Sequence, residues 1–382
     1  MQSRAYFDHN ATTPLAGEVA AAFTAALRDV YGNASSIHQE GQAAKRTLER
    51  ARREIAALVG AGPKEIVLLS GGTEANNLAL SACSPGTHVV TTAVEHPAVL
   101  GPCARLEQAG VAVTYVAPAR NGGVPIEAVR DALRPETSLI SVMHANNETG
   151  VVQPVAEIGA LARERGIRFH IDGVQAAGKL PIDVQALGCD YYSLSAHKLY
   201  APKGVGALYV RPGAPLHAQL LGGHQERDRR AGTENVPAVA AFGAAARLAL
   251  ANHHDNLRLA ELRDRLETGI LSSIPDAWVN GAGAHRLPNT TNIGFAGVEG
   301  EAMVIALDLR GFAVSSGSAC SSGAVEPSHV LLAMGLSRED ARSSLRFSLG
   351  QSNTTEQVDA LIEAVAASIT QLRRVSATYS HA

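Results

Sequence analysis

Seven short apolar runs, separated mostly by helix-like or glycine-rich connections, constrain the fold of this 382-residue chain more than any other feature. Continuous runs rich in β-branched residues are typical of strands that helices cover on both faces of a parallel sheet. We therefore predict a large α/β domain over residues 15–250. The runs are EIVLLS, THVVTTA, VAVTYV, SLISVMH, IRFHID, DYYSLS and VGALYV, which begin at residues 65, 87, 111, 138, 167, 190 and 205.

The pattern changes after an alanine- and leucine-rich helical stretch that begins near residue 236. Beyond this stretch, strand-like and helix-like segments alternate with wider spacing. A chain of this length also exceeds the size at which one hydrophobic core keeps growing. We therefore predict a second, smaller α/β domain that is built from residues 1–14 and 251–382.

The charge balance argues against several classes of partner. The formal net charge is only −3, so no global field attracts nucleic acid or an anionic membrane surface. No apolar run approaches the roughly 20 residues of a membrane span. The N-terminal MQSRAYFDHNATTP lacks the apolar core of a signal peptide. We expect a cytoplasmic protein that acts on a small molecule.

The four cysteines are widely spaced and form no C-x-x-C pair. This spacing favours neither a zinc site nor a disulfide framework, so we expect no metal. Cys83, Cys103 and Cys189 stand in helical or apolar contexts, which predicts small core residues. Cys320 differs, because it stands in the serine- and glycine-rich stretch SSGSACSSG at residues 315–323.

The motif SGGTEANN, at residues 70–77, follows a predicted strand and opens a predicted helix. Its glycines permit close approach of the backbone, and the free N–H groups at a helix start can bind a phosphate. The alternative is a glycine turn that only ends a strand.

Two further motifs follow strands. Asp172 ends the run FHID, where a carboxylate is costly without a cationic partner; the alternative is an aspartate that caps the next turn. Lys198 is one of only five lysines, and Ser195 and His197 are its neighbours. A lysine amine in a confined site becomes a nucleophile toward an aldehyde, whereas most lysines are merely solvated. Pyridoxal 5′-phosphate combines a phosphate, a ring nitrogen and an aldehyde, the three groups that these motifs suit.

With these motifs the chain resembles the cysteine desulfurases of iron–sulfur cluster assembly, which are class V aminotransferase-like pyridoxal phosphate enzymes. The resemblance runs from YFDHNATTP near the start to SSLRFSLG near the end, and GGHQERDRRAGTEN leans toward the nitrogen-fixation subgroup. It implies fold type I, with a large domain around a mainly parallel, seven-stranded type of sheet and a smaller C-terminal α/β domain. The other motifs that carry it are TEANN, EHPAV, NNETG, DGVQAAGK, SAHKLYAPKG and SSGSAC.

The resemblance also implies the chemistry. The enzyme would take sulfur from L-cysteine, release L-alanine and carry the sulfur as a persulfide on Cys320 to an acceptor protein such as an iron–sulfur scaffold. A pliant loop can move Cys320 between substrate and acceptor, although a solvent-exposed linker has the same composition. Lys198 would form the Schiff base with the cofactor. His96 would stack on the cofactor ring and handle protons, or would simply cap a turn.

The remaining implied roles concern binding. Arg346 would pair with the substrate carboxylate through its planar fork, with help from Asn33, or would belong to a structural ion pair. Thr233 would reach the phosphate of the neighbouring subunit in a homodimer with shared active sites, or would lie in a solvated loop. The cofactor contacts would come from Asp172 at the pyridine nitrogen, Asn147 and Gln175 at the phenolic oxygen, and Thr73, Ser195 and His197 at the phosphate.

Two rival functions stay open. An aminotransferase or a selenocysteine lyase would have the same fold, but a transaminase has no need for Cys320. A protein of a different class would mainly dock the partners of sulfur delivery, with catalysis secondary.

Overall fold

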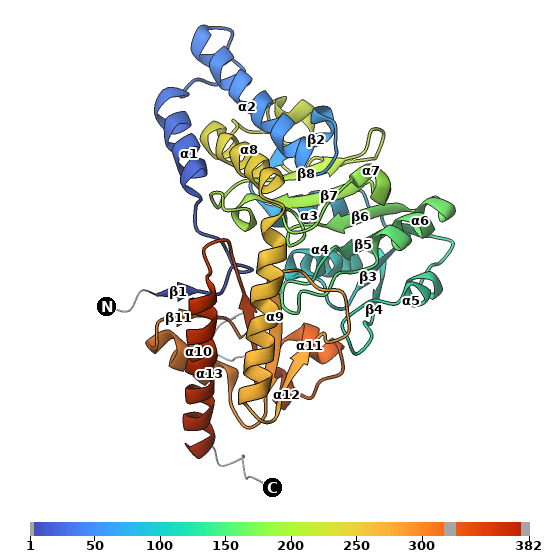
Figure 1. Ribbon diagram of the computed structural model, residues 1–382. Helices are drawn as coiled ribbons and strands as arrows, with labels where there is room; N and C mark the ends of the chain where they lie inside the picture. The colour runs from blue at the N-terminus through green and yellow to red at the C-terminus, as the bar shows by residue number, and fades with distance from the viewer. Residues whose placement is uncertain (1–3, 317–325, 376–382) are drawn as a thin grey trace.

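The computed structural model describes residues 4–316 and 326–375, so Cys320 lies outside the described residues. Two regions, each built around a sheet, lie at opposite ends of the molecule (Figure 1). The long helix α9 (Asp255–Ser273) runs down from the first region along the second.

All seven predicted strands form, and they make one sheet in the order β2-β8-β7-β6-β5-β3-β4. Only β8 runs against its two neighbours, so the prediction of a mainly parallel sheet is confirmed. Every residue of β2, β3, β7 and β8 is buried, as expected for strands covered on both faces. The strands are β2 (Ile66–Leu69), β3 (His88–Thr92), β4 (Ala112–Val116), β5 (Thr137–Met143), β6 (Arg168–Asp172), β7 (Tyr191–Ser195) and β8 (Gly206–Val210).

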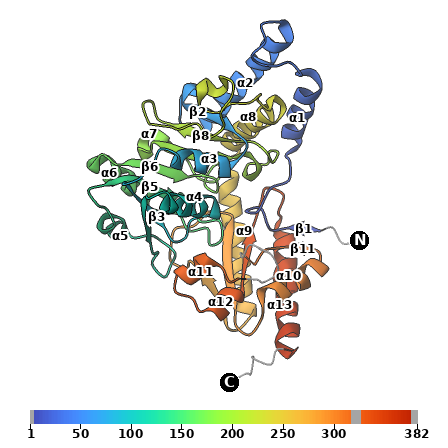
Figure 2. The same ribbon diagram turned by 180° about the vertical axis from the view of Figure 1, so that it is seen from behind.

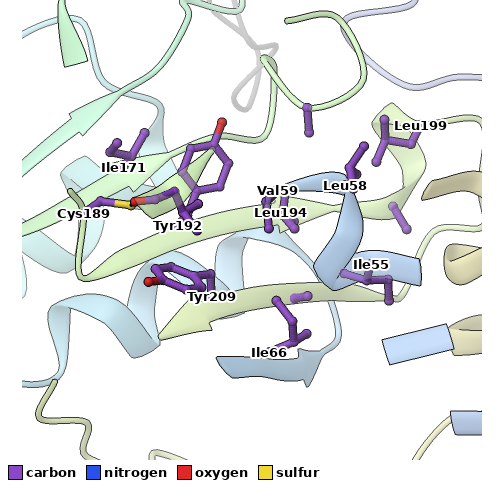
Figure 3. Close-up of a cluster of buried hydrophobic side chains, with 14 of the residues drawn as sticks. Ile55, Leu58, Val59, Ile66, Ile171, Cys189, Tyr192, Leu194, Leu199 and Tyr209 are labelled. Carbon is purple, nitrogen blue, oxygen red and sulfur yellow. The ribbon is translucent and has the colours of Figure 1, made fainter. Parts of the chain in front are cut away.

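One face of this sheet is covered by α2 (Gln39–Leu58) and its neighbours. Apolar residues at helical spacing, among them Leu48 and Ile55, are buried, while the charged residues of α2 mostly point outward. Ile55 lies against the strand residues Ile66 and Leu194 in the core shown in Figure 3. The helix ends just before Gly60, whose φ of 70° suits the left-handed turn that follows a helix.

The other face is covered by α3 (Gly72–Leu80) and α4 (Pro97–Gln108), which lie in front of the sheet in Figure 2. Alternate strand residues supply the two cores, because successive side chains of a strand point to opposite faces. Cys83 and Cys103 lie in this second core, and Cys189 lies in the first. The prediction that these cysteines are small core residues is confirmed.

The first region also contains further helices, which pack around the sheet and its connections (Figure 1). They are α1 (Gly17–Asp29), α5 (Ile126–Asp131), α6 (Val155–Arg165), α7 (Val184–Leu187), α8 (Val236–Ala251), and the 3₁₀ turns η1 (Pro63–Glu65), η2 (Ala196–Lys198) and η3 (Gln225–Asp228).

The second region packs α9 and the C-terminal helix α13 against a three-stranded antiparallel sheet with the order β12-β10-β9. Leu262 and Leu266 of α9 meet Phe347 and Leu361 in its core. The elements that follow α9 are β9 (Ala277–Asn280), β10 (Thr290–Phe295), α10 (Gly300–Leu309), β11 (Phe312–Ala313), α11 (His329–Ala333), α12 (Arg338–Arg342), β12 (Ser344–Ser348) and α13 (Thr355–Val375). Of these, α11 and α12 place their buried residues in the core of the first region.

The N-terminal segment connects the two regions. The strand β1 (Ala5–Tyr6) pairs in parallel with β11, and Asp8 forms a bridge with Ser348 at the end of β12. A few residues later, the Thr13 N–H donates to the His197 carbonyl at 3.0 Å, next to the large sheet. Residues 8–13 therefore contact both regions.

A buried ion pair closes the edge strand β2. Arg52 of α2 and Glu226 share two bonds of 2.7 Å, and the same carboxylate accepts the Leu68 N–H at 2.8 Å. Arg52 also donates to the Ile66 carbonyl at 2.9 Å. The backbone groups of the edge are thus satisfied within the protein. The turn holds Glu226 and its next two residues at φ of 48°, 58° and 64°, which is strained for residues other than glycine.

Residues 4–316 and 326–375 contain neither a candidate membrane span nor a candidate metal centre. No helix there combines the length and the apolar composition that crossing a bilayer demands. That part of the chain also contains no group of three or more histidine, cysteine, aspartate or glutamate side chains able to hold a metal ion.

Candidate active site

A cavity of about 410 Å³ opens beside the large sheet, where several polar residues that follow strand ends meet. The carboxyl ends of parallel strands are the usual ligand site of open α/β sheets. Most of the lining comes from the first region, and we refer to that part as the sheet-side wall. Ser315 and Arg346 form the opposite C-terminal wall. The full lining is Asn10, Ala11, Gly72, Thr73, Asn76, His96, Ala98, Met143, Ala145, Asn147, Asp172, Val174, Gln175, Ser195, His197, Lys198, Ser315 and Arg346.

The start of α3 forms one end of the sheet-side wall. Gly72 packs closely there, because a Cβ on this residue would lie 2.7 Å from the Val174 side chain. The N–H groups of the first turn of a helix have no partners within the helix, so they suit an anion. Thr73, Ser195 and His197 line the same cavity. The donors that the sequence predicts for a phosphate are therefore brought together.

Asp172, at the end of β6, is buried but well supplied with donors. One carboxylate oxygen accepts the Val174 N–H at 3.0 Å, so the turn-capping alternative is correct in itself. The other oxygen accepts the Asn76 amide at 2.7 Å. These two bonds fix the carboxylate in the wall of the cavity. A carboxylate held in this way can also pair with a protonated ring nitrogen.

Lys198 follows β7, and its amine is held by main-chain carbonyls. Nζ donates to Ala11 O at 2.7 Å and also to Asn10 O. Burial first, and then the nearby Arg346 guanidinium, lower the pKa of this amine to about 8, while Asp8 and Asp172 oppose the shift. About a tenth of the amine is therefore neutral, and so nucleophilic, at pH 7, far more than for a lysine with the usual pKa of 10.5.

His96 both caps α4 and lines the cavity. Its Nδ1 accepts the Ala98 N–H at 3.0 Å, so the proton of the neutral ring is on Nε2. Burial lowers the pKa of His96, and the positive charges of Lys198 and His329 add to this shift, while Asp172 opposes it. The neutral imidazole, with its proton fixed on Nε2, can therefore exchange a proton with a ligand in the cavity.

Arg346, on β12, belongs to an ion pair and also faces the cavity. Its side chain is 7% exposed and pairs with Asp8 at 2.6 Å, so the ion-pair alternative is correct in itself. A second nitrogen donates to the Asn147 carbonyl at 3.1 Å. Its Nε is buried without a hydrogen-bond partner among the described residues. Each terminal nitrogen carries a second N–H, so the guanidinium, which lines the cavity, retains donors for an anionic ligand.

Gln175 and Asn147 complete the group of predicted residues that the structure brings together. The Gln175 amide nitrogen donates to the Asn10 carbonyl at 2.9 Å, and the Asn10 amide donates to the Asn147 carbonyl at 3.1 Å. Both residues line the cavity that Asp172 and Arg346 also line.

Two predicted residues, Asn33 and Thr233, lie elsewhere. Asn33 is exposed, and its side chain accepts the Ser35 N–H at 2.9 Å. Thr233 is exposed on the loop that follows η3, outside the cavity of its own chain. Cys320 lies outside the described residues, although Ser315, five positions before it, lines the cavity.

The sequence reasoning missed the residues that hold the functional side chains in place. Asn76 holds Asp172, Asp8 holds Arg346, and the carbonyl of Asn10 holds Lys198. All three stand in motifs that the resemblance uses, TEANN and YFDHNATTP. The motifs therefore mark Asn76, Asp8 and Asn10 as candidate site residues, but they do not indicate that these residues hold other side chains in place.

Comparisons with known proteins identify the family of the chain. A model of the aminotransferase class-V family matches residues 5–361. A cysteine desulfurase of Trichormus azollae is 47% identical over 376 residues, which are 97% of this chain and 94% of the relative. A cysteine desulfurase of Sinorhizobium fredii is 48% identical over 375 residues, which are 96% of this chain and 97% of the relative.

Solved structures are similar over the same extent. A NifS-like protein has a TM-score of 0.90 at 33% identity and covers 97% of this chain and 100% of its own. The structure described as SspA in complex with cysteine has a TM-score of 0.79 at 36% identity, with coverage of 90% and 98%. The family model, the relatives and the fold thus agree, and the chain belongs to the class-V aminotransferases and, within them, to the cysteine desulfurase family.

Proposed function

We propose that this protein is a pyridoxal 5′-phosphate-dependent cysteine desulfurase, which converts L-cysteine to L-alanine and transfers the sulfur to Cys320. One observation carries the proposal: a buried amine, a buried carboxylate and a helix start with free N–H groups line one cavity opposite an arginine. The relatives named cysteine desulfurase support the reaction, and the SspA structure with cysteine supports the substrate.

The residues present suit the cofactor. When bound, pyridoxal phosphate supplies an aldehyde that links to amines and a ring that takes up electrons. Thr73, Ser195, His197 and the first turn of α3 would hold the phosphate. Asp172, fixed by Asn76, would keep the ring nitrogen protonated. Asn147 and Gln175 would donate to the phenolic oxygen.

The amine and the imidazole would move protons. Lys198, partly neutral near neutral pH, would link to the cofactor and then take the α-proton of the substrate. His96, held as the neutral Nε2–H tautomer, would stack on the ring and exchange a proton with the substrate thiol or with Cys320.

Arg346 would bind the substrate carboxylate. Its two terminal nitrogens each keep a second N–H, and the bond to Asp8 fixes the fork. A bidentate pair with a carboxylate gives both charge and direction, so the α-carbon would be aimed at Lys198. Asn33 would assist from outside the described cavity.

The sulfur step balances without a further reactant. The Cys320 thiolate attacks the substrate sulfur, the bond between that sulfur and the β-carbon breaks, and its electron pair stays with the carbon. Protonation of this carbon gives L-alanine, and Cys320 keeps the sulfur as a persulfide. Transfer to an acceptor protein, such as an iron–sulfur scaffold, or reduction by a thiol then restores Cys320.

A homodimer would complete each site. Thr233 is exposed and lies outside its own cavity, so its hydroxyl is free to reach the cofactor phosphate of a second subunit. We place this dimer in the cytoplasm, where thiols stay reduced.

The deciding experiment measures alanine and sulfide released from L-cysteine with a thiol reductant present. Wild-type enzyme should release both in equal amounts, and Cys320→Ser should keep the visible cofactor band but lose turnover. Equal turnover by Cys320→Ser would contradict the persulfide. Preference for selenocysteine, or alanine formation that depends on a keto acid, would favour the two rival enzymes. Partner binding that persists in Lys198→Ala, combined with negligible wild-type turnover, would favour a docking platform.

A further inference from the structure

A second lysine lies behind the cavity and is not used by the proposed reaction. Lys179 donates from Nζ to the main-chain carbonyl of Gln175 at 3.0 Å and to its side-chain Oε1 at 3.1 Å. It lines a separate cavity of about 50 Å³, which Lys198 also lines from the other side. Lys179 thus touches a residue of the active site without entering the site.

The contact with Lys179 decides which way the Gln175 amide faces. An ammonium group has donors and no acceptor, so only the carbonyl oxygen of Gln175 can face it. A reversed amide would place an NH₂ group against the Lys179 donors. The Gln175 nitrogen must therefore point away from Lys179, and it donates to the Asn10 carbonyl at 2.9 Å.

The same carbonyl also holds the reactive amine. Asn10 O accepts a bond from Lys198 Nζ in addition to the bond from Gln175. An unbroken series of contacts therefore runs from Lys179 through Gln175 and Asn10 to Lys198. The second hydrogen on the Gln175 nitrogen remains available for an acceptor in the active-site cavity, which Gln175 lines.

We infer that Lys179 is a positioning residue: it fixes the Gln175 side chain so that its NH₂ group, and not its carbonyl, faces the cofactor oxygen. The inference rests on the proposed function, in which Gln175 donates to the phenolic oxygen of pyridoxal phosphate. Burial lowers the pKa of the Lys179 amine to about 7, so the ammonium form, which donates and does not accept, is the form that fixes the amide at and below this pH.

The test compares cofactor affinity and the visible band of the bound cofactor, which reports the ionisation of the phenolic oxygen. Lys179→Met and Lys179→Leu remove the donor, so affinity should fall roughly 10-fold to 100-fold, and the band should shift. Two donor-free variants are used in case one of them fails to fold. Lys64→Met, at an exposed position, is the matched control and should bind as the wild type does.

Two further variants separate positioning from charge. Lys179→Gln keeps an NH₂ donor without the charge and should recover most of the affinity. In a Gln175→Leu background, Lys179→Met should cause no further loss, because the two changes interrupt one contact. A Lys179→Gln enzyme as weak as Lys179→Met, or fully additive losses in the double variant, would mean that Lys179 acts through its charge and would overturn the inference.

The outcomes also distinguish this inference from the function beneath it. A wild-type protein without a cofactor band overturns the proposed function, and the inference with it. A normal wild-type band that both Lys179→Met and Lys179→Leu leave unchanged overturns the inference alone.

Discussion

On the sheet-side wall of the cavity, Asp172 is held by Asn76 and by the turn that follows its own strand, so both of its partners belong to the same region. On the C-terminal wall, Arg346 is held by Asp8 and by the Asn147 carbonyl, neither of which belongs to its sheet. Asp172 therefore needs one folded region for its position, whereas Arg346 needs three parts of the chain assembled. Changes in the two walls should have separable effects.

The largest effect is expected on the sheet-side wall. Lys198→Ala removes both the amine that links to the cofactor and the base that moves the α-proton. A positioned acid or base alone contributes about 10²–10⁴-fold, so turnover of L-cysteine should fall by at least roughly 10⁴-fold. The measurement is alanine release, together with the visible cofactor band. Lys64→Met is the control, and substantial turnover by Lys198→Ala would break the comparison.

A large effect on stability is expected at the edge of the same region. Glu226→Ala leaves the Arg52 guanidinium buried without its partner and the Leu68 N–H unsatisfied. Breaking a buried pair in this way costs about 3–5 kcal/mol, which urea unfolding would measure. Arg265→Ala breaks an exposed pair with Asp359 in the C-terminal region and should leave the free energy of unfolding unchanged. Equal losses in both variants would show that burial does not separate the two regions.

On the C-terminal wall, Arg346→Ala should affect the substrate and spare the cofactor. Hydrogen bonds to charged groups contribute about 1.5–3 kcal/mol, so kcat/KM for L-cysteine should fall roughly 10-fold to 100-fold, mainly through KM. The visible band should keep its intensity. Loss of the cofactor in this variant would contradict the assignment of cofactor binding to the sheet-side wall and substrate binding to the C-terminal wall.

The smallest expected effect is a shift in the pH dependence of cofactor uptake. It connects Lys198 on the sheet-side wall with Arg346 on the C-terminal wall. Burial and then Arg346 lower the pKa of Lys198 to about 8 from its usual 10.5. The rate at which apo-enzyme takes up the cofactor should therefore rise with a midpoint near pH 8. Arg346→Ala should move this midpoint upward, because the nearby cation is removed. An unchanged midpoint would show that burial alone sets this pKa.

The lowered pKa of Lys198 also makes the free energy of unfolding depend on pH. Between pH 8 and pH 10.5 the unfolded chain keeps the proton on Lys198 and the folded chain does not. The contribution of Lys198 to the free energy of unfolding therefore rises with pH between pH 8 and pH 10.5. The comparison of wild type with Lys198→Met in urea at pH 7 and pH 10 measures it.

The strands of the large sheet were predictable because each one is a local apolar run. The reversed direction of β8 was not, since VGALYV has the same composition as its parallel neighbours. Asp172 and Lys198 stood out because each follows such a run. Their supports did not, because Asn76 lies 96 positions from Asp172, and Asp8 lies 338 positions from Arg346. Composition and spacing contain no information on contacts of that range.

The resemblance identified positions without explaining them. It named Arg346 and His96, and the structure adds that the first is already in an ion pair and the second already caps a helix. It also named Thr233, which is exposed on its own chain, so a role for Thr233 needs a second subunit.

The N-terminal segment has a consequence for the order of events during synthesis. Asn10 and Ala11 leave the ribosome among the first residues, yet the Asn10 N–H donates to the Ser348 hydroxyl, 338 positions later. The carbonyls that hold Lys198 therefore cannot settle until translation has almost finished. The large sheet can form in a partly made chain, but Lys198 takes its final position only after the last strand, β12, has been made. Lys198 therefore reaches its final position only after the chain has been synthesised as far as Ser348.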